Sequence, residues 1–212
     1  MDPEDVIGMN FVALDIEGSG GNVRRDSYGT GSVVSLGAVD FNTKEEFYEE
    51  CRVMDGRGYD SQALLINGFT KEQIFDTKKQ SVLELLVKFE DFCKAHGSKL
   101  IGAWGMYDLK MLIASYGYYS RNWELPYSYL NLKSVSKIML GNARPGLSNT
   151  AIKLGMQAEQ MPHTGMSGAR LATENASVLL FGSHYYGSYS ACPIPLLKLV
   201  PSKLPVTKVH LK

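Results

Sequence analysis

Short apolar runs bounded by turn residues predict a series of strands in the first half of the chain. The run from Val6 to Ile16 is rich in strand-forming residues and is typical of a buried strand. Residues 32–41 predict a second strand. Residues 46–53 alternate weakly, which predicts a third strand, antiparallel to the second through the Asn42-Thr43 turn. Two more short strands are expected over residues 100–104 and 129–132.

Apolar residues recur at helical spacing in the middle of the chain. The side chains of Val82, Leu85, Leu86, Phe89 and Cys93 fall on one face of a helix that Gly97 is expected to end. Further helices are expected over residues 109–116, 147–154 and 169–181. Strands first, and then helices that alternate with single strands, predict an α/β domain with a central mixed five-stranded sheet flanked by helices.

The pattern changes near residue 183, so we expect a folded domain over residues 1–182 and a tail over residues 183–212. The tail contains four lysines, four prolines and no acidic residue, which predicts an extended, weakly ordered basic segment. Such a short charge pattern favours a solvated terminus over an arm that contacts phosphates. A domain of this length buries a sizeable core without disulfides or a structural metal.

Composition narrows the class of protein. The 22 basic and 22 acidic residues give a formal net charge of zero, which argues against coating of nucleic acid or anionic lipid through bulk charge. Three cysteines fit neither a disulfide framework nor a zinc site and indicate a reducing compartment. No apolar run is long enough to span a membrane, and the acidic start is unlike a targeting leader. We therefore expect a cytoplasmic protein without membrane contact, and a nuclear location is the alternative.

Two acidic residues, Asp15 and Glu17, interrupt the first apolar run. Because the side chains of a strand alternate between its two faces, both carboxylates are expected to point the same way. Adjacent carboxylates raise each other's pKa unless a cation lies between them, and Mg²⁺ or Mn²⁺ suits such oxygen ligands. The alternative is a solvent-facing edge strand, which the flanking apolar residues disfavour.

Two further segments carry candidate chemistry. Asp108 stands where an apolar strand meets a helix, a position at which an acid often caps the first turn. His163 lies in a loop that contains proline and glycine just before a helix, where a surface or packing histidine is the plainer interpretation. Taken alone, neither residue indicates catalysis.

Taken together, in this order and spacing, the segments resemble the DEDDh family of 3′→5′ exonucleases, the DnaQ-like branch of the ribonuclease H-like fold. Asp15 and Glu17 match the family's first motif, Asp108 the second and His163 the third, and the stretch Trp104–Asp108 is similar to the ERI-1-type exoribonucleases. Supporting matches are Leu36-Gly37-Ala38-Val39, which resembles the second strand, and Ile66-Asn67-Gly68-Phe69-Thr70, which resembles the I-x-G-I-T turn. The resemblance spans about residues 11–181.

The resemblance implies a hydrolase with two divalent ions, Mg²⁺ or Mn²⁺, held by three aspartates and a glutamate. By this resemblance Asp15 would bridge both ions, and Glu17 and Asp108 would contribute to their shell. His163 would accept the proton of the attacking water as general base.

The same resemblance suggests which residues contact nucleic acid. Gly18 and Ser19 would lie against the terminal nucleotide, since they have little side chain. Arg24 and Arg25, in the glycine-rich loop that follows, are candidates for phosphate contact, although a solvated loop is equally expected. Tyr107 is a candidate for stacking on a base, whereas core packing is the better interpretation of the neighbouring tryptophan.

The third motif departs from the family pattern. An aspartate is expected five residues after His163, but this chain has Gly168 there. Helical rotation turns Glu174 away from that position, and Asn175 is neutral and lies about 10 Å along the helix axis, so neither replaces the missing carboxylate. We therefore expect the second ion to be held weakly or lost, and Mg²⁺, with its strict octahedral geometry, to be affected most.

The expected function is metal-dependent 3′→5′ hydrolysis of single-stranded nucleic acid ends, with RNA slightly preferred over DNA, weakened by the missing carboxylate. The alternative is a catalytically inactive relative that binds nucleic acid or a protein partner, and a third option is a scaffold that keeps the fold alone. Retention of the four other motif residues favours the enzyme, because an abandoned site has no physical need for two adjacent buried acids.

Overall fold

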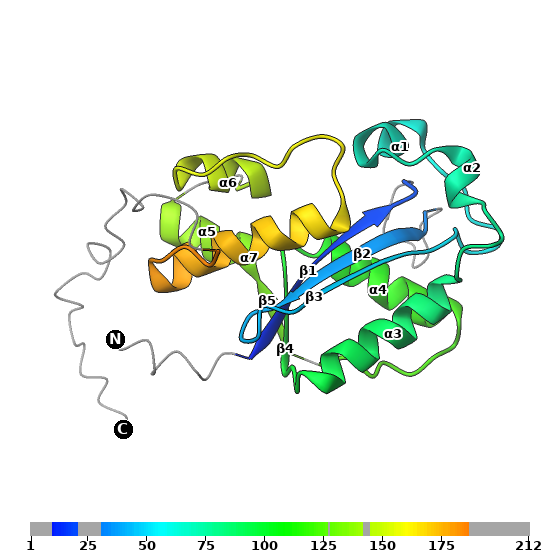
Figure 1. The fold of residues 1–212 in the computed structure, drawn as a ribbon, viewed down its shortest axis with the longest axis horizontal. Coiled ribbons are helices and arrows are strands. Elements are labelled where there is room, and N and C mark those ends of the chain that lie inside the picture. Colours follow the sequence, from blue (N-terminus) through cyan, green and yellow to red (C-terminus); the bar gives the residue numbers. More distant parts are fainter. Residues whose placement is uncertain (1–9, 21–30, 127, 142–144, 187–212) are drawn as a thin grey trace, which may run out of the picture.

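A mixed sheet of five strands forms the centre of the domain (Figure 1). The computed structural model describes residues 10–20, 31–126, 128–141 and 145–186. The strands are β1 Phe11–Gly18, β2 Val33–Asp40, β3 Glu46–Glu50, β4 Leu100–Ala103 and β5 Ser128–Asn131. They lie in the order β3-β2-β1-β4-β5. The pairs β1–β2 and β2–β3 are antiparallel, and β1–β4 and β4–β5 are parallel. The predicted mixed five-stranded sheet, with its antiparallel meander, is thus confirmed.

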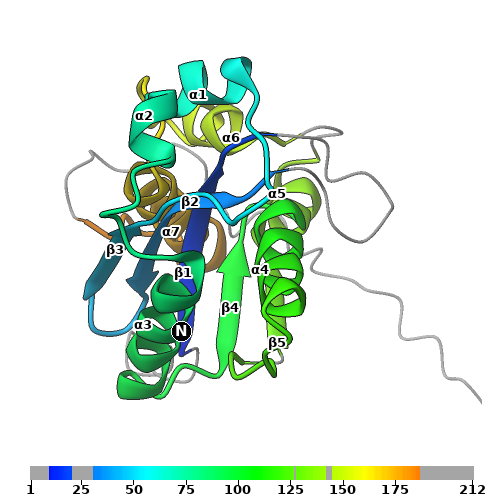
Figure 2. The same cartoon turned by 90° about the vertical axis from the view of Figure 1, so that its right-hand side faces the viewer.

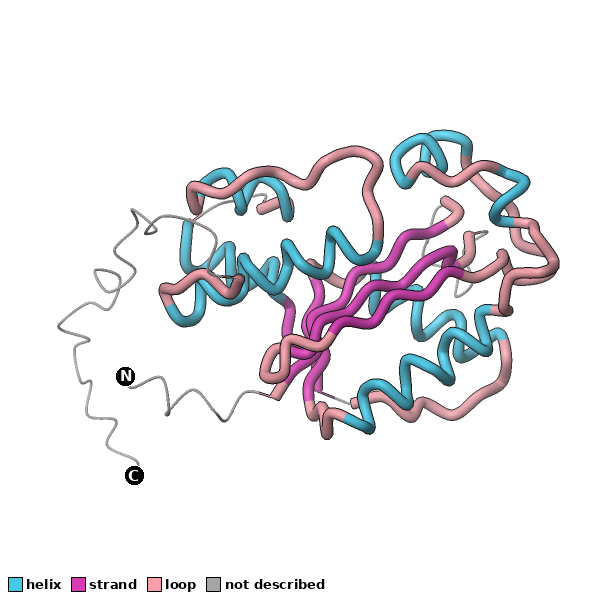
Figure 3. Tube along the Cα trace, viewed as in Figure 1, coloured by secondary structure: helices cyan, strands magenta, loops and turns pink. Residues whose placement is uncertain are grey.

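Helices cover both faces of this sheet (Figures 2 and 3). In the described residues they are α1 Ser61–Asn67, α2 Lys71–Ile74, α3 Val82–Ala95, α4 Tyr107–Tyr118, α5 Leu132–Leu140, α6 Leu147–Lys153 and α7 Gly165–Phe181. One face carries α7, packed on β1 and β2 with α5 and α6 beside it, and the other face carries α3 and α4. None of these helices is both long and apolar enough to cross a membrane.

Odd and even positions of β1 face opposite layers of the domain. The even positions from Val12 to Ile16 are buried in a core that also contains residues of α3 and α4. The odd positions begin with Phe11 and Ala13, which belong to a second core with alanines of α7. Asp15 and Glu17 continue this odd row and are partly exposed. The period of two therefore aims both acids at the layer in which α7 begins.

Two glycines allow α7 to lie directly on the sheet. A Cβ at Gly37 of β2 would overlap the backbone of Gly165, and a Cβ at Gly165 would lie 2.7 Å from the nitrogen of Gly37. A side chain at either position would therefore push the helix away from the strands. The helix begins here because Thr164 and Ser167 form a reciprocal capping box. Its first turn is thus held against the end of β1.

Among the described residues, three helices were not predicted by apolar spacing. The short α1 and α2 are fixed by their ends rather than by an apolar face. Asp60 caps α1, Gly68 with a φ of 76° ends it, and Thr70 opens α2 with a capping box. The third, α5, follows β5 directly, with Asn131 as its cap. The apolar residues of the strand and of the helix are therefore continuous in the sequence, which hides the boundary between them.

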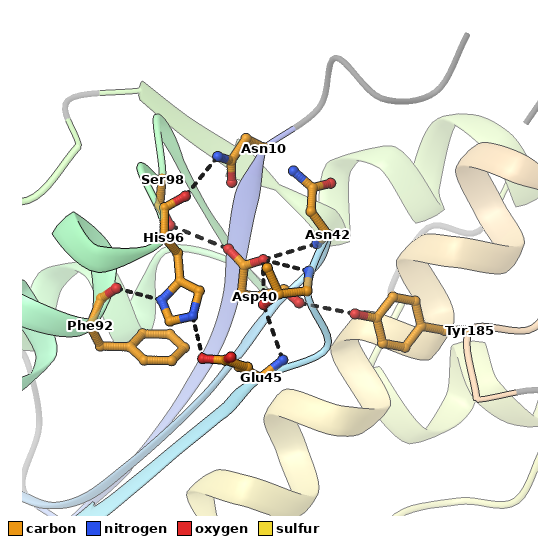
Figure 4. A network of polar contacts seen from close by, with 9 residues as sticks. Asn10, Asp40, Asn42, Glu45, Phe92, His96, Ser98 and Tyr185 are labelled. Carbon is orange, nitrogen blue, oxygen red and sulfur yellow. Dashed lines mark hydrogen bonds and ion pairs between the residues drawn. The ribbon is translucent and has the colours of Figure 1, made fainter. Parts of the chain in front are cut away.

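A network of polar contacts closes the end of the sheet remote from the acids of β1 (Figure 4). Asp40 accepts hydrogen bonds from two backbone N–H groups of the β2–β3 turn, at 3.1 and 2.8 Å. The side chain of Asn10 donates to the carbonyl of His96 at 3.0 Å, and the ring of His96 contacts Glu45 at 2.6 Å. The hydroxyl of Tyr185 donates to the Asp40 carbonyl at 3.0 Å. The network therefore joins β1, β2, the end of α3 and the segment after α7.

Residues 183–186, which the prediction placed in the tail, pack against the folded domain. The carboxylate of Glu174 in α7 contacts Nδ1 of His184 at 2.7 Å and accepts the backbone N–H groups of Tyr185 and Tyr186 at 3.0 and 3.1 Å. The rest of the predicted tail, residues 187–212, lies outside the described residues, and its extended character stays a prediction.

Candidate active site

A cleft of about 410 Å³ opens at the carboxyl end of β1. Its walls come from the end of β1, the beginning of α4, the beginning of α6 and the loop that leads into α7. The four residues assigned to chemistry from the sequence all line it. The full lining is Asp15, Ile16, Glu17, Trp104, Tyr107, Asp108, Gly146, Leu147, Ser148, Asn149, Glu159 and His163.

Asp15 and Glu17 share one face of the central strand. β1 lies between β2 and β4, so the alternative of a solvent-facing edge strand is wrong. Both side chains point into the cleft from the odd row of β1. The prediction that they share a face is confirmed.

Asp108 reaches the cleft from the first turn of α4. The helix begins at Tyr107, after the N-cap residue Met106, so Asp108 is the second helical residue and does not cap the helix. Its side chain is buried, with 5% of the residue exposed. Hydrogen bonds from the backbone N–H groups of Ile16 and of Asp108 itself act on the carboxylate. The capping interpretation is therefore wrong, and the acid is turned toward β1 instead.

His163 is held by a loop that rests on the turn between α1 and α2. Its backbone N–H donates to the carbonyl of Ile66 at 2.9 Å. A Cβ at Gly68 would lie 2.7 Å from the Cβ of Pro162, so only a glycine lets this turn approach so closely. The ring of His163 is one third exposed, and its Nδ1 lies 3.7 Å from Oε2 of Glu159. The segment that resembles the I-x-G-I-T turn thus supports the histidine.

Glu159 is the residue of the site that sequence reasoning missed. It lies four residues before His163, and 6% of its side chain is exposed. The hydroxyl of Ser167 donates to its Oε1 at 2.6 Å, and its backbone N–H donates to Ser148 Oγ at 3.2 Å. The residues considered as replacements for the missing aspartate, Glu174 and Asn175, both follow Gly168 on the helix. Glu159 instead precedes His163, and an acid in this loop is the signal in the sequence that points to it.

Gly168 faces the carboxylate of Asp15 directly. A Cβ at position 168 would overlap the Asp15 carboxylate and lie 3.0 Å from the Asp15 Cβ. The two residues rejected as substitutes are engaged elsewhere. Glu174 binds the segment after α7, and the side chain of Asn175 donates to the carbonyl of Leu147 at 3.1 Å.

Burial and mutual repulsion raise the pKa values of the acids in the cleft. The pKa of Asp15 lies well above its usual value because the carboxyl is desolvated and faces Asp108, Glu17 and Glu159. Burial, and then the charge of Glu159, raises the pKa of Glu17 to about 7. Burial also raises the pKa of Asp108, although its backbone hydrogen bonds oppose the shift. A cation between these groups would relieve the repulsion.

The donor set fits a hard divalent ion. One potential ligand atom from each of Glu17, Glu159 and His163 lies within 4.8 Å of the others, and Asp15 and Asp108 adjoin this group. Carboxylate oxygens are the ligands preferred by Mg²⁺, and Mn²⁺ accepts both these oxygens and an imidazole nitrogen. The residues present therefore fit the kind of ion that nucleases of this fold use.

The residues predicted to contact nucleic acid differ in how accessible they are from the cleft. Tyr107 is exposed at the wall of the cleft. Ser19 is fully buried, and its hydroxyl donates to the carbonyl of Gly58 at 2.8 Å, so its side chain is committed to the protein interior. Gly18 lies beside Met111 and the Tyr107 hydroxyl, and its carbonyl accepts a bond from an asparagine side chain. Arg24 and Arg25 lie outside the described residues.

A mixed sheet whose central strand carries paired acids, completed by an acid from a helix and a histidine before the last helix, defines the class of DnaQ-like nucleases with a ribonuclease H-like fold. Within this class the chain belongs to the Rv2179c-like family, whose model, described as a 3′-5′ exoribonuclease Rv2179c-like domain, matches residues 10–180. It is thus a 3′-5′ exonuclease by family. No curated protein sequence matches it.

Solved structures share the fold. The nuclease domain of 3′hExo, a DEDDh family member bound to rAMP, is 17% identical, with 84% of this chain and 94% of that chain covered and a TM-score of 0.67. A 3′-exonuclease in 3′-end specific recognition of histone mRNA stem-loop is 16% identical, with 84% of each chain covered and a TM-score of 0.67. Cell-death related nuclease 4 (CRN-4) is 12% identical, with coverages of 84% and 65% and a TM-score of 0.64. The predicted resemblance and fold class are confirmed.

Proposed function

We propose that the protein is a divalent-metal-dependent 3′→5′ exonuclease that shortens single-stranded nucleic acid ends, with RNA preferred over DNA. The observation that carries the proposal is the convergence of Asp15, Glu17, Asp108 and His163 on one cleft. These residues come from β1, from α4 and from the loop before α7, which are far apart in the chain. A structural role in the core would not require the raised pKa values of Asp15 and Glu17, which burial and neighbouring carboxylates cause.

Each residue has a role in this proposal. Asp15, Glu17 and Asp108 bind the metal. When bound, the metal supplies the positive charge that activates water and stabilises the reacting phosphate. His163 stands at the cleft with a partly exposed ring and accepts the proton of the attacking water. The oxygen of that water forms a bond to phosphorus while the bond to the 3′ oxygen of the penultimate nucleotide breaks. The terminal nucleotide leaves as a 5′-monophosphate, and the freed 3′ oxygen takes up a proton from solvent.

The substrate is a single strand in this proposal because the cleft, at about 410 Å³, has the size of a small-ligand pocket, which an unpaired end can enter with one nucleotide. Tyr107, exposed at its wall, offers an aromatic surface on which the terminal base stacks. The preference for RNA rests on the exoribonuclease description of the family and on a neighbour of the same fold that is bound to rAMP. Gly18, Arg24 and Arg25 are proposed contacts of the sugar and phosphates.

The test uses 5′-labelled RNA and DNA strands of one sequence, each with a free or a phosphate-blocked 3′ end, in Mg²⁺ or Mn²⁺. We expect a ladder of shortened products from free ends, formed faster on RNA. Asp15→Asn removes charge that holds the metal. Since a metal contributes several kcal/mol of charge stabilisation, the rate should fall at least about a hundredfold.

Asp91→Asn is the matched control, because Asp91 is exposed on α3, away from the cleft. It should leave the rate unchanged. A natural protein that binds the strands but does not shorten them, in either metal, would replace this proposal with the inactive binding module.

A further inference from the structure

We infer that Glu159 supplies the fourth carboxylate of the metal site. It does so from the loop before His163, and it replaces the aspartate that the family pattern has at the position of Gly168. The inference rests on the proposed function and deepens it, because it assigns a further metal ligand to the same cleft. It removes the main argument for an inactive protein, which was a missing acid in the third motif.

With the Asp15 carboxylate where it lies, the space around Gly168 has no room for an acidic side chain. A Cβ there would overlap the carboxylate of Asp15. Asp15 cannot simply retreat, because its own Cβ would also lie only 3.0 Å away and its backbone belongs to the central strand. With glycine at 168, Asp15 occupies the room that a side chain from α7 would need. A fourth acid therefore has to enter the cleft from another direction.

Glu159 enters from that direction and is fixed in place. The Ser167 hydroxyl binds its Oε1 at 2.6 Å, and Ser167 is itself part of the capping box with Thr164. Its backbone is bound to Ser148 at the start of α6. The first turn of α7 thus still contributes to the site, since it positions a carboxylate instead of providing one. Oε2 is left facing the cleft and His163.

The surroundings of Glu159 call for a cation. Its side chain is largely buried, it lies near Asp15 and Glu17, and the one ion-pair partner found for it in the described part of the chain is His163, at 3.7 Å. A buried carboxylate without a close permanent cation is costly. The same Glu159 also has a ligand atom within 4.8 Å of those of Glu17 and His163. A divalent ion satisfies all three at once.

The first test measures Mn²⁺ binding by calorimetry, and the spectrum of bound Mn²⁺ by electron paramagnetic resonance, in the natural protein and in Glu159→Gln. Loss of one anionic ligand should weaken the affinity at least about tenfold, as a lower bound taken from outer-shell changes, and alter the spectrum. Glu124→Gln is the matched control, because Glu124 is exposed and paired with Lys94. It should bind Mn²⁺ like the natural protein.

A different role for Glu159 gives a different result. If Glu159 only positions the ring of His163, Glu159→Gln will change the pH profile of RNA shortening while Mn²⁺ affinity and spectrum stay those of the natural protein. That outcome overturns the inference and leaves the exonuclease intact. A natural protein that neither binds Mn²⁺ nor shortens RNA refutes the proposed function itself, and the inference with it.

The second test restores the family's acid with Gly168→Asp. If Glu159 already supplies the fourth carboxylate, a further acid has no free place in the metal shell and crowds Asp15, so Mn²⁺ affinity should not rise above that of the natural protein. If the site simply lacks an acid, Gly168→Asp should bind Mn²⁺ more tightly than the natural protein, which contradicts the inference. Thermal unfolding in EDTA verifies that each variant is folded before binding is measured.

Discussion

At the scale of single residues, the acids of the cleft lower the stability of the metal-free domain. The pKa of Glu17 is about 7 in the folded protein, above its ordinary value of 4.5. The folded state therefore retains a proton that the unfolded state has already lost. By linkage, the contribution of this group to stability is fully present below pH 4.5 and is lost as the pH rises toward 7.

Glu17→Gln is therefore expected to stabilise the metal-free protein at pH 8, because glutamine stays neutral in the cleft. The gain in the free energy of unfolding should reach at most about 3 kcal/mol. It should be much smaller at pH 5, where the folded protein already holds Glu17 protonated. Urea unfolding in EDTA at both pH values measures the effect. An equal gain at both pH values would mean that the charge of Glu17 is not the cause.

Single residues also show which parts of the site could be predicted from the sequence and which could not. Asp15 and Glu17 were placed correctly because the period of a strand is a local property. Asp108 was located correctly but with a capping role as its plain interpretation, because the helix was expected to begin two residues later than it does. Glu159 was missed, because its one signal in the sequence, an acid four residues before His163, does not say where its side chain points. Its role arises only when folding brings Ser167 beside it.

At the scale of elements, the turn between α1 and α2 acts as a support for the histidine. Gly68 ends α1 in the left-handed conformation and faces Pro162, while Ile66 receives the backbone N–H of His163. Neither short helix contributes a residue to the cleft lining. The two helices therefore contribute to the site by holding the loop of His163 in place.

Gly68→Ala should lower the free energy of unfolding by about 1–2 kcal/mol and slow RNA shortening severalfold, because the added methyl group presses on Pro162. Mn²⁺ affinity through the carboxylates should change less than the rate. Gly56→Ala is the control that isolates backbone strain, since Gly56 also has a positive φ of 73° but nothing within 4 Å of an added Cβ. A rate loss equal to that of Gly56→Ala would exclude the contact with Pro162 as the cause.

Elements with an apolar face were predicted from the sequence, and elements fixed only by their ends were not. α3 buries five residues of its periodic face together with Glu90, and its boundaries agree closely with the spacing of its apolar residues. α1 and α2 are too short to show such a period, and their caps become readable only once the turn is known. α5 carried its own signals, Asn131 before it and Gly141 after it, which the adjoining strand obscured.

At the scale of the whole molecule, stability and chemistry occupy opposite ends of the sheet. The cleft lies at the carboxyl end of β1, and the contacts of Asp40 and Tyr185 close the other end. Glu174 anchors the segment after α7 there through two backbone N–H groups and His184. A change at this end should therefore alter stability without altering the reaction.

Glu174→Ala tests this separation. The substitution leaves the buried N–H group of Tyr185 and the partly buried N–H group of Tyr186 without their acceptor, so the free energy of unfolding should fall by about 2–4 kcal/mol. The rate of RNA shortening per folded molecule should stay unchanged at a temperature where the variant is fully folded. Urea unfolding and the RNA assay together measure both quantities. A variant that is stable but slow would place Glu174 in communication with the cleft after all.

The two rows of side chains on β1 also have a consequence for how this strand unfolds. β1 presents Asp15 and Glu17 on one side. On its other side, Val12, Leu14 and Ile16 are buried in the core that also contains residues of α3 and α4. Local opening normally spares such a central strand. We therefore expect the backbone amide protons beneath the acids to exchange with solvent only when the entire domain opens, which hydrogen exchange measures.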